Sequence, residues 1–549
     1  MTSSTPPTQP GPEYLEQGGG APLGREPRGA TGGRRKALLA GVAVVGLGAV
    51  GAGVWAATSF LATGAQPDEA LPASTLGYAS IDLDPSGGQK IEAFEVLRKF
   101  PAFRDKVGLD AEDDIKKYIF DKAGLADECS GLDYEDDLEP WLGDRAALAA
   151  VELDEEPVPV AVLQVTDADA AATGLAALRD CGGDQSLGWE IDGDWAVVAE
   201  TAALAREVAA ETAKGTLAED ADYRRWTGEV GDAGVLNLYA APEAGDYLAD
   251  HLDHLFPFGP MMGMAPQTTV YDPAADDMPP GPQLPEELVE ALRDFTGMAA
   301  TLRFDDGALE LESVGDAAAL RQSYYDTDAG DDVLASLPAD TAAAFGVGFA
   351  DGWGQHLLDE VTRSLGGGEQ AENMIRQAEQ WTGLELPEDL ETLFGDSAVL
   401  AMGADFDPEA LEGGDASGVP IGLKVKGDAA EVERVLDKIR TRLGVPMSEP
   451  LHSRADGDVV AIGPSDDYLT KIVGDGALGE SEAFQDVVRE AERSGVILFV
   501  NFDAGGDWLT ALAEDDPEAA ENLEPLEAFG ASSWQEGETA HGTLRLTTD

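Results

Sequence analysis

The chain has 549 residues, of which 35 are Lys or Arg and 106 are Asp or Glu, so its formal net charge at pH 7 is −71. Such a charge excludes nucleic acid as a ligand, because phosphate contacts depend on Lys and Arg. It also repels anionic lipid headgroups and favours cationic partners or, more weakly, divalent cations. Hydrophobic residues make up 43% of the chain, so the charge does not imply disorder and a real core can form.

The first 62 residues predict a tail followed by a membrane helix. Residues 1–33 are rich in Pro, Gly, Ser and Thr and predict a disordered cytoplasmic tail. Arg34, Arg35 and Lys36 then precede residues 37–62, which carry no charge and would span about 39 Å as a helix, more than the ~30 Å hydrocarbon core. We therefore predict a transmembrane helix over residues 34–62. The positive-inside rule places its N-terminus in the cytoplasm and the bulk of the chain outside the membrane.

A second interpretation of this segment is an export signal. Arg34 and Arg35 before a Gly-rich apolar run resemble a twin-arginine signal, and residues 63–65 could form a small-residue cleavage site. The resemblance is partial, because Ala37 stands where that motif usually has a large apolar residue. Both interpretations export the rest of the chain.

Residues 63–70 predict a short tether, and the remainder contains an internal duplication. Residues 71–90 pair with residues 337–356 without a gap, beginning LPAS in one copy and LPAD in the other. Further matches follow in the same order: residues 136–150 with 388–402, 158–165 with 419–426, 192–194 with 456–458, 235–240 with 497–502, and 301–313 with the C-terminal HGTLRLTT. A period this long predicts tandem domains, residues 71–330 and residues 331–549.

Each copy predicts an α+β domain. In the first copy, apolar and polar residues alternate over residues 76–83, and β-rich runs follow at residues 146–153 and 158–165. An Asp-Gly turn at Gly193 predicts a hairpin, and helical patterns follow from residue 201. Consecutive strands joined by short turns predict two homologous α+β halves with mainly antiparallel sheets and helices packed on one face.

The first copy carries an insertion at residues 256–285 that the second copy lacks. Its Pro and Gly content opposes regular structure, yet it has a cluster of apolar side chains: Phe256, Phe258, Met261, Met262 and Met264. A Met-rich loop of this kind either forms an adaptable contact surface or folds back over its own domain.

Cys129 and Cys181 are the two cysteines of the chain. An even pair outside the cell predicts a disulfide, which would stabilise the fold by about 3–4 kcal/mol on the chain-entropy model. Catalytic redox chemistry is not expected, because there is no C-x-x-C motif.

An acidic turn in the first copy is a candidate ligand site. Its Asp-x-Asp-x-Ser-Gly pattern begins like a calcium loop, but the twelfth position is Ala93 and the pattern fails as an EF-hand. A Gly-Gln-basic tripeptide follows in both copies and could hold an anion at a helix start, although a loop closing onto a helix is the favoured explanation. The candidate ligand site comprises Asp82, Asp84, Gln89, Lys90, Gln355 and His356.

The sequence shows no hydrolase motif, P-loop or kinase motif, so no catalytic residue, cofactor or metal is expected. The duplicated body resembles the bacterial family called domain of unknown function 3352. The resemblance rests on the apolar segment, the LPAS opening, residues 81–90, the LEPWLG run at residues 138–143, and the cysteine pair. It implies a membrane-tethered protein of the bacterial cell envelope and supplies no activity, since the family has none assigned.

Three functions remain open. The first is a non-enzymatic binding or scaffold protein of the cell envelope. The second is a carrier or sensor for an apolar or lipid-like envelope molecule, which a deep apolar cavity would favour. The third is an enzyme without a recognisable motif, which convergent polar groups around Lys90 or His356 would favour.

Overall fold

The computed structural model describes residues 65–82, 88–104, 115–122, 131–181, 187–232, 234–255, 286–316, 327–364, 368–406, 418–443, 451–505 and 516–549. Among these residues no helix is long and apolar enough to cross a bilayer. The predicted tail, transmembrane helix and insertion lie outside the described residues and stay predictions.

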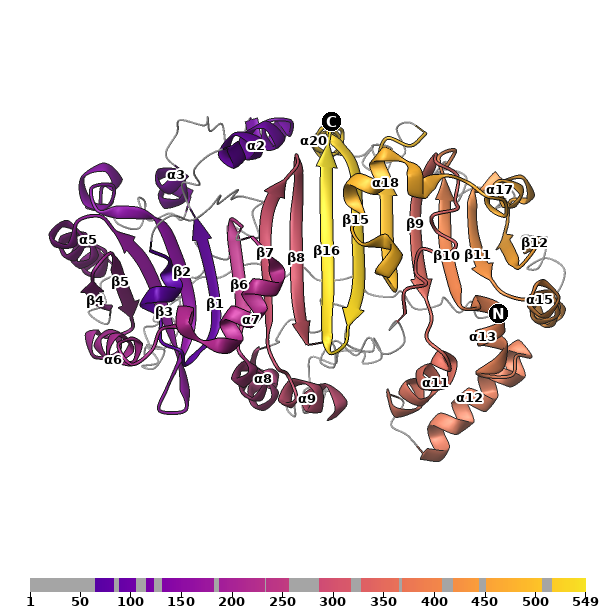
Figure 1. Ribbon diagram of the computed structural model, residues 1–549, viewed down its shortest axis with the longest axis horizontal. Helices are drawn as coiled ribbons and strands as arrows, with labels where there is room; N and C mark the ends of the chain where they lie inside the picture. The colour runs from indigo at the N-terminus through magenta and orange to yellow at the C-terminus, as the bar shows by residue number, and fades with distance from the viewer. Residues whose placement is uncertain are drawn as a thin grey trace, which may run out of the picture.

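One antiparallel sheet of 16 strands organises the described part of the chain (Figure 1). The first half contributes β1 (Thr75–Asp82), β2 (Leu142–Leu153), β3 (Glu156–Val165), β4 (Gly188–Asp192), β5 (Trp195–Ala199), β6 (Leu236–Ala240), β7 (Met298–Asp305) and β8 (Ala308–Asp316). The second half contributes β9 (Thr341–Gly348), β10 (Ser397–Gly403), β11 (Ile421–Lys426), β12 (His452–Asp456), β13 (Val459–Gly463), β14 (Val496–Asn501), β15 (Leu526–Glu536) and β16 (Thr539–Thr548). The predicted α+β class with antiparallel pairing is confirmed, but the two halves share one sheet because β8 pairs with β16.

The strand order is the same in both halves. Outward from the centre, the first half runs β8-β7-β6-β1-β2-β3-β5-β4 and the second runs β16-β15-β14-β9-β10-β11-β13-β12. The register is also kept: Ser80 faces Ala147 in the first half, and Gly346 faces Val399 at the corresponding positions of the second. The duplication seen in the sequence is therefore a duplication of strand topology.

The structure corrects the last of the sequence matches. The β7–β8 hairpin closes at Asp305 and Ala308, and the β15–β16 hairpin closes at Glu536 and Thr539, so β15 is the counterpart of β7. Residues 301–313 were matched instead to β16, because a Thr-Leu-Arg tripeptide occurs in both. The match of residues 235–240 is similarly shifted by two positions, since Leu236 and Val496 occupy equivalent positions beside β1 and β9.

Helix starts are also duplicated, and side-chain caps explain why these segments are helical. Thr201 accepts a hydrogen bond from the backbone N–H of the third residue of α6 (Ala202–Thr212), and Ser465 caps α17 (Asp466–Ile472) in the same way. Asp220 caps α7 (Ala221–Val230), and Ser481 caps α18 (Glu482–Val487). A short 3₁₀ helix precedes α7 and α18 alike: η4 (Leu217–Glu219) and η8 (Leu478–Glu480).

Helices pack on both faces of the sheet, which corrects the prediction of one covered face. We call front face the side that bears Tyr78, Ala147, Val399 and Phe499; α6 and α7 in the first half and α17 and α18 in the second lie over it. The opposite side is the back face. It is covered at its two ends, in the first half by α5 (Ala168–Cys181) and in the second by α15 (Ala429–Leu443).

The remaining helices lie near the ends of the strands. The first half has α2 (Gly88–Leu97), α3 (Ile115–Lys122), the π-helix η3 (Tyr134–Leu138), α8 (Pro242–Leu255) and α9 (Glu286–Arg293). The second half has α11 (Trp353–Ser364), α12 (Gly368–Thr382), α13 (Glu388–Phe394), the 3₁₀ helix η9 (Ala491–Arg493) and α20 (Pro517–Leu523). The predicted tether at residues 63–70 is partly structured: η1 (Pro67–Ala70) packs into the first-half core, where Ala70 and Leu71 are buried.

Candidate functional site

The structure does not bring the predicted ligand site together. β1 and β9 run in opposite directions in the sheet. The helices that follow them, α2 and α11, therefore lie beyond opposite ends of the strands (Figure 1). Gln89 and Lys90 begin α2, whereas Gln355 and His356 begin α11. The six residues therefore form no single site, because the sequence repeats a motif whose two copies are related by the pseudo-symmetry of the fold.

The parts of that predicted site have ordinary structural surroundings where they are described. Asp82 lies 3.4 Å from Arg145 (Oδ2 to Nε), and Gln355 donates a hydrogen bond of 2.7 Å to Asp359. His356 is exposed on α11. Asp84 and the side chains of Gln89 and Lys90 lie outside the described residues.

Two further predictions also involve residues that the structure leaves undescribed. The Met-rich contact segment, Phe256 to Met264, is one of them. Cys181 ends α5, but its predicted partner Cys129 is not described, so the disulfide stays a prediction. Within the described residues, no group of three His, Cys, Asp or Glu side chains is arranged to hold a metal ion.

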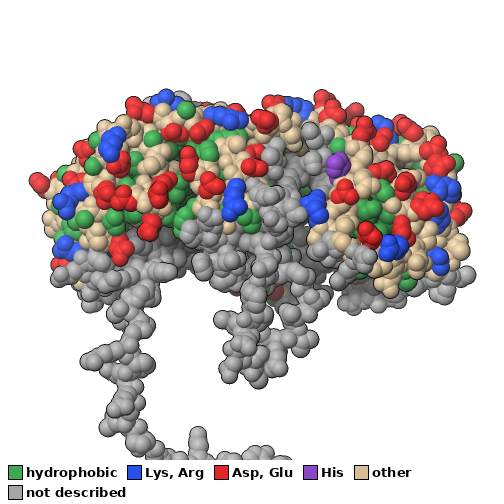
Figure 2. All heavy atoms as spheres, turned by 90° about the horizontal axis from the view of Figure 1, so that it is seen from below, with side chains coloured by type: hydrophobic (Ala, Val, Ile, Leu, Met, Phe, Trp, Pro, Cys, Tyr) green, Lys and Arg blue, Asp and Glu red, His purple; other side chains and the backbone are tan. Residues whose placement is uncertain are grey.

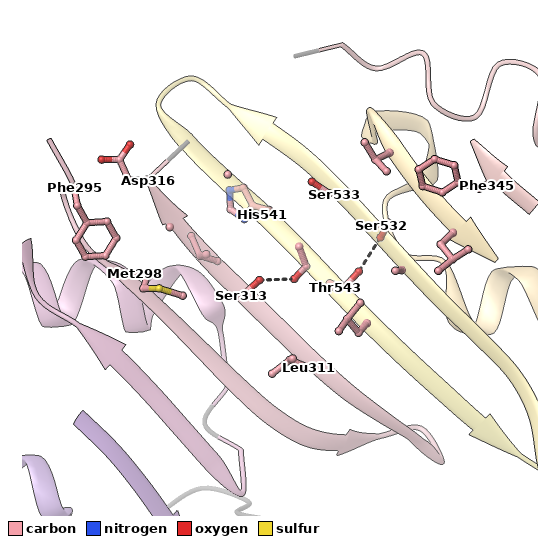
Figure 3. Close-up of a pocket in the computed structure, with 18 residues that line it drawn as sticks. Phe295, Met298, Leu311, Ser313, Asp316, Phe345, Ser532, Ser533, His541 and Thr543 are labelled. Carbon is pink, nitrogen blue, oxygen red and sulfur yellow. Dashed lines mark hydrogen bonds between the residues drawn. The ribbon is translucent and has the colours of Figure 1, made fainter. Parts of the chain in front are cut away.

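A groove of about 460 Å³ lies on the back face, over the central strands where the two halves meet (Figure 3). Its described lining residues are Phe295, Met298, Leu311, Ser313, Val314, Gly315, Asp316, Phe345, Val496, Leu498, Ala531, Ser532, Ser533, Ala540, His541, Gly542, Thr543 and Leu544. Most of these residues are apolar. Phe345 is 45% exposed and Leu544 is 41% exposed, which is unusual for large apolar side chains in the middle of a sheet.

The floor of the groove consists of small residues in neighbouring strands. Gly542 of β16 faces Ser313 of β8 on one side and Ser533 of β15 on the other, so these three positions share one face of the sheet. A Cβ atom at position 542 would lie 3.1 Å from the Oγ of Ser313. The absence of a side chain at Gly542 is therefore what gives the groove its depth.

Larger side chains form the walls. Met298 lies at one end and Phe345 at the other in Figure 3. Leu311 and Leu544 are opposite each other in β8 and β16 and close the floor along the strand direction. The groove therefore runs across the strands rather than along them.

The duplication explains why the groove is asymmetric about the seam between the halves. The hairpin registers make Gly542 the counterpart of Leu311, and Leu544 the counterpart of Ser313. The pair Ser313–Gly542 is thus related by the pseudo-two-fold axis to the pair Leu311–Leu544. One pair is small and forms the floor, whereas its symmetry mate is large and fills the equivalent space.

On the front face of the same strands, the seam between the halves buries an ionic cluster. Arg545 of β16 is 2% exposed, and its guanidinium contacts the carboxylates of Glu310 and Asp305, the latter at 3.0 Å. Its Nε donates a hydrogen bond of 2.8 Å to the backbone carbonyl of Asp486 in α18. This arginine therefore ties the second half to the first.

Two further arginines belong to the cluster, and one of them, Arg489, lies 3.4 Å from the carboxylate of Asp305 and 3.9 Å from that of Glu310. Arg303 of β7 lies 2.5 Å from the carboxylate of Glu310 and also contacts Glu312. Burial raises the pKa of Glu312, while the hydrogen bond from Arg303 opposes that shift. Each buried charge has a partner of opposite sign. The cluster on the front face therefore fixes the register of the strands that bear the groove on their back face.

The polar groups next to the groove are engaged within the protein. Ser313 donates to the carbonyl of Gly542 at 3.3 Å, whereas the hydroxyls of Ser532 and Thr543, which lie on the front face with Arg545, share a hydrogen bond of 2.7 Å. The ring of His541 stacks on Trp534 with 5.1 Å between centroids, and burial lowers the pKa of this histidine. Groups held in this way suit the passive binding of an apolar molecule better than proton transfer.

Sequence reasoning missed the groove residues because nothing in the pattern marks Ser313 or Gly542 as special. The available signal was the pair of turns at Asp306-Gly307 and Gly537-Glu538, which fixes the hairpin alignment. Aligning on those turns would have matched Gly542 with Leu311 and revealed a large-to-small difference between the copies.

No curated protein and no solved structure was found to match the chain. A family model described as protein of unknown function, DUF3352, matches residues 38–411, which include the first half and part of the second. The chain therefore belongs to the DUF3352 family.

Proposed function

We propose that this protein is a non-enzymatic binding protein of the cell envelope, anchored by its N-terminal segment, which holds an apolar or lipid-like molecule in the back-face groove. The groove itself is the observation that carries the proposal. Its volume of about 460 Å³ falls within the ~300–1,000 Å³ typical of small-molecule sites, and its described lining is predominantly apolar.

The exposed apolar side chains of the lining favour the binding of an apolar ligand. Phe345, Leu544 and Met298 are each about 40% exposed or more, on adjoining parts of one face. A contiguous apolar surface in water is costly, since burial contributes about 25 cal/mol per Å². A bound apolar molecule would recover this free energy.

The surroundings favour binding over catalysis. Of the groove hydroxyls, that of Ser313 is hydrogen-bonded within the sheet, and Ser532 and His541 lie on the front face of the same strands. A nucleophile would need a base within hydrogen-bond reach, and these side chains are not arranged in that way. We therefore propose a carrier or sensor rather than an enzyme.

The location belongs to the same proposal. The uncharged run at residues 37–62 behind Arg34, Arg35 and Lys36 supports a cytoplasmic N-terminus, a single membrane pass and an extracytoplasmic body. Acidic side chains are spread over the edge of the molecule seen in Figure 2, with fewer basic ones among them. Such a surface supports a body that stands away from anionic headgroups.

Native mass spectrometry of the full-length protein tests the proposal. The protein is released from its membrane in polymer-bounded discs, without detergent, and compared with the Gly542→Leu variant prepared in the same way. We expect a co-purified apolar molecule on the wild type and its loss from the variant. If both proteins carry the same molecules, or neither carries any, the groove is not the ligand site.

A scaffold role is the second candidate, and one surface favours it. Leu357 and Val361 of α11 and Met374 and Trp381 of α12 are exposed, Trp381 to 76%. Exposed aromatic and aliphatic side chains on a helical hairpin are typical of protein–protein contacts. If the contact joins two copies, a Trp381→Ser variant should sediment as a smaller species than the wild type.

A further inference from the structure

We infer that the groove takes an amphiphile with an extended alkyl chain and a head group that is not anionic. This inference rests on the proposed function and specifies the ligand of the same site. It follows from the length of the groove, from the residues of its floor and walls, and from the charge around it.

The length of the groove fits an extended hydrocarbon chain. Its lining extends from Met298 of β7 to Phe345 of β9, which are separated by five strand spacings in the sheet. At about 4.8 Å per spacing the groove is roughly 24 Å long. The groove is therefore an elongated site that an extended alkyl chain can occupy along its length.

The floor and walls also suit an extended molecule. The floor consists of the small residues Ser313, Gly542 and Ser533 in one row and Gly315 and Ala540 in the next, and it is raised on the other side by Leu311 and Leu544. An extended alkyl chain can lie across the strands on this floor.

Charge selects against an anionic head group. The chain carries a formal net charge of −71, so an anionic amphiphile is repelled at long range. None of the described lining residues is Lys or Arg, so a sulfate or carboxylate would find no counter-charge in the groove. A neutral or cationic head group meets neither obstacle.

Photo-crosslinking on the full-length protein in membrane vesicles tests the inference. The probe is a dodecyl chain with a diazirine at its end and a neutral maltoside head group. Peptide mapping should place the label on residues of β14 to β16 or β8. Octyl, decyl and dodecyl maltosides then compete, and we expect the half-displacing concentration to rise about 15-fold for each two methylenes removed, at about 0.8 kcal/mol per methylene.

Two further competitors test the charge of the head group. Dodecyl sulfate should compete more weakly than dodecyltrimethylammonium. If dodecyl sulfate competes as well as dodecyltrimethylammonium, or chain length has no effect, the alkyl-chain inference fails. The proposed function survives that result provided that labelling still depends on Gly542.

Variants distinguish a failure of the alkyl-chain inference from a failure of the proposed function. Gly542→Leu fills the floor and should abolish labelling, whereas Ser313→Ala keeps the volume and should not reduce it. Leu400→Ala is the matched control, because Leu400 is 52% exposed on the same face but does not line the groove. If Gly542→Leu does not fold, Phe345→Ala at the far wall should weaken dodecyl more than octyl binding. Labelling that is unchanged by both variants overturns the inference and the proposed function together.

Discussion

Replacing Arg545 with Met is expected to destabilise the protein by about 3 kcal/mol, the lower end of the range for breaking a buried ion pair. Arg545 is 2% exposed, and the side chain of its partner Glu310 is 4% exposed, so water cannot replace the lost contact. Two backbone carbonyls, of Asp305 and Asp486, also lose a donor. The low end applies because Arg303 still lies 2.5 Å from the Glu310 carboxylate.

Urea unfolding of the full-length protein, followed by tryptophan fluorescence, measures this change. The control is Arg376→Met on α12, because Arg376 is half exposed and its ion pair with Glu372, at 3.4 Å, lies on the surface; this variant should change stability by less than about 0.5 kcal/mol. The double variant Glu310→Leu/Arg545→Met removes both charges and should be closer to wild type than Arg545→Met alone. A loss below about 1 kcal/mol for Arg545→Met, or strictly additive single changes, would refute the cluster as the element that holds the seam.

Other predictions concern a buried lysine, the cysteines and the N-terminus. Burial lowers the pKa of Lys424 to about 8, below its value near 10.5 in the unfolded chain, so the unfolded state binds more protons between these pH values. Stability should therefore rise with pH by up to about 3 kcal/mol relative to a Lys424→Met variant, measured by unfolding from pH 7 to pH 10. Reduction should destabilise the protein by about 3–4 kcal/mol if Cys129 and Cys181 are linked, and non-reducing peptide mapping identifies the link. An intact mass that begins near residue 66 would exclude a retained anchor in favour of a cleaved export signal.

The repeated topology could be predicted from the sequence because each half follows local rules. The Asp-Gly turn at Gly193 and the alternation in residues 76–83 depend on neighbours in the chain, and both gave strands in the structure. The single 16-stranded sheet could not be predicted in this way. It depends on pairing between β8 and β16, in which Glu312 faces Thr543, 231 positions later in the chain, and no local pattern encodes such a contact.

The candidate site was harder to predict for a related reason. Gln89 and Gln355 were predicted to form a site because their motif is repeated. In a pseudo-symmetric fold, however, the two copies of a motif lie at opposite ends of the strands. The groove arises instead where the copies differ, at Gly542 and Leu311. Differences between copies are not visible until the copies are aligned correctly, and the Thr-Leu-Arg match aligned β16 with the wrong strand.

A size difference between equivalent residues of the two copies has its largest effect at the seam between the halves. Along a two-fold seam each strand lies beside its own duplicate, so a small residue in one copy can face a small residue in the other and open a continuous floor, as Gly542 does with Ser313. The same substitution in an outer strand would produce only an isolated hollow under one helix. The front face of the seam is held by charges that pair across the halves, with Arg545 of one bound to Glu310 of the other. An asymmetric groove on one face and an interlocking cluster on the other therefore make the duplicated halves one binding unit.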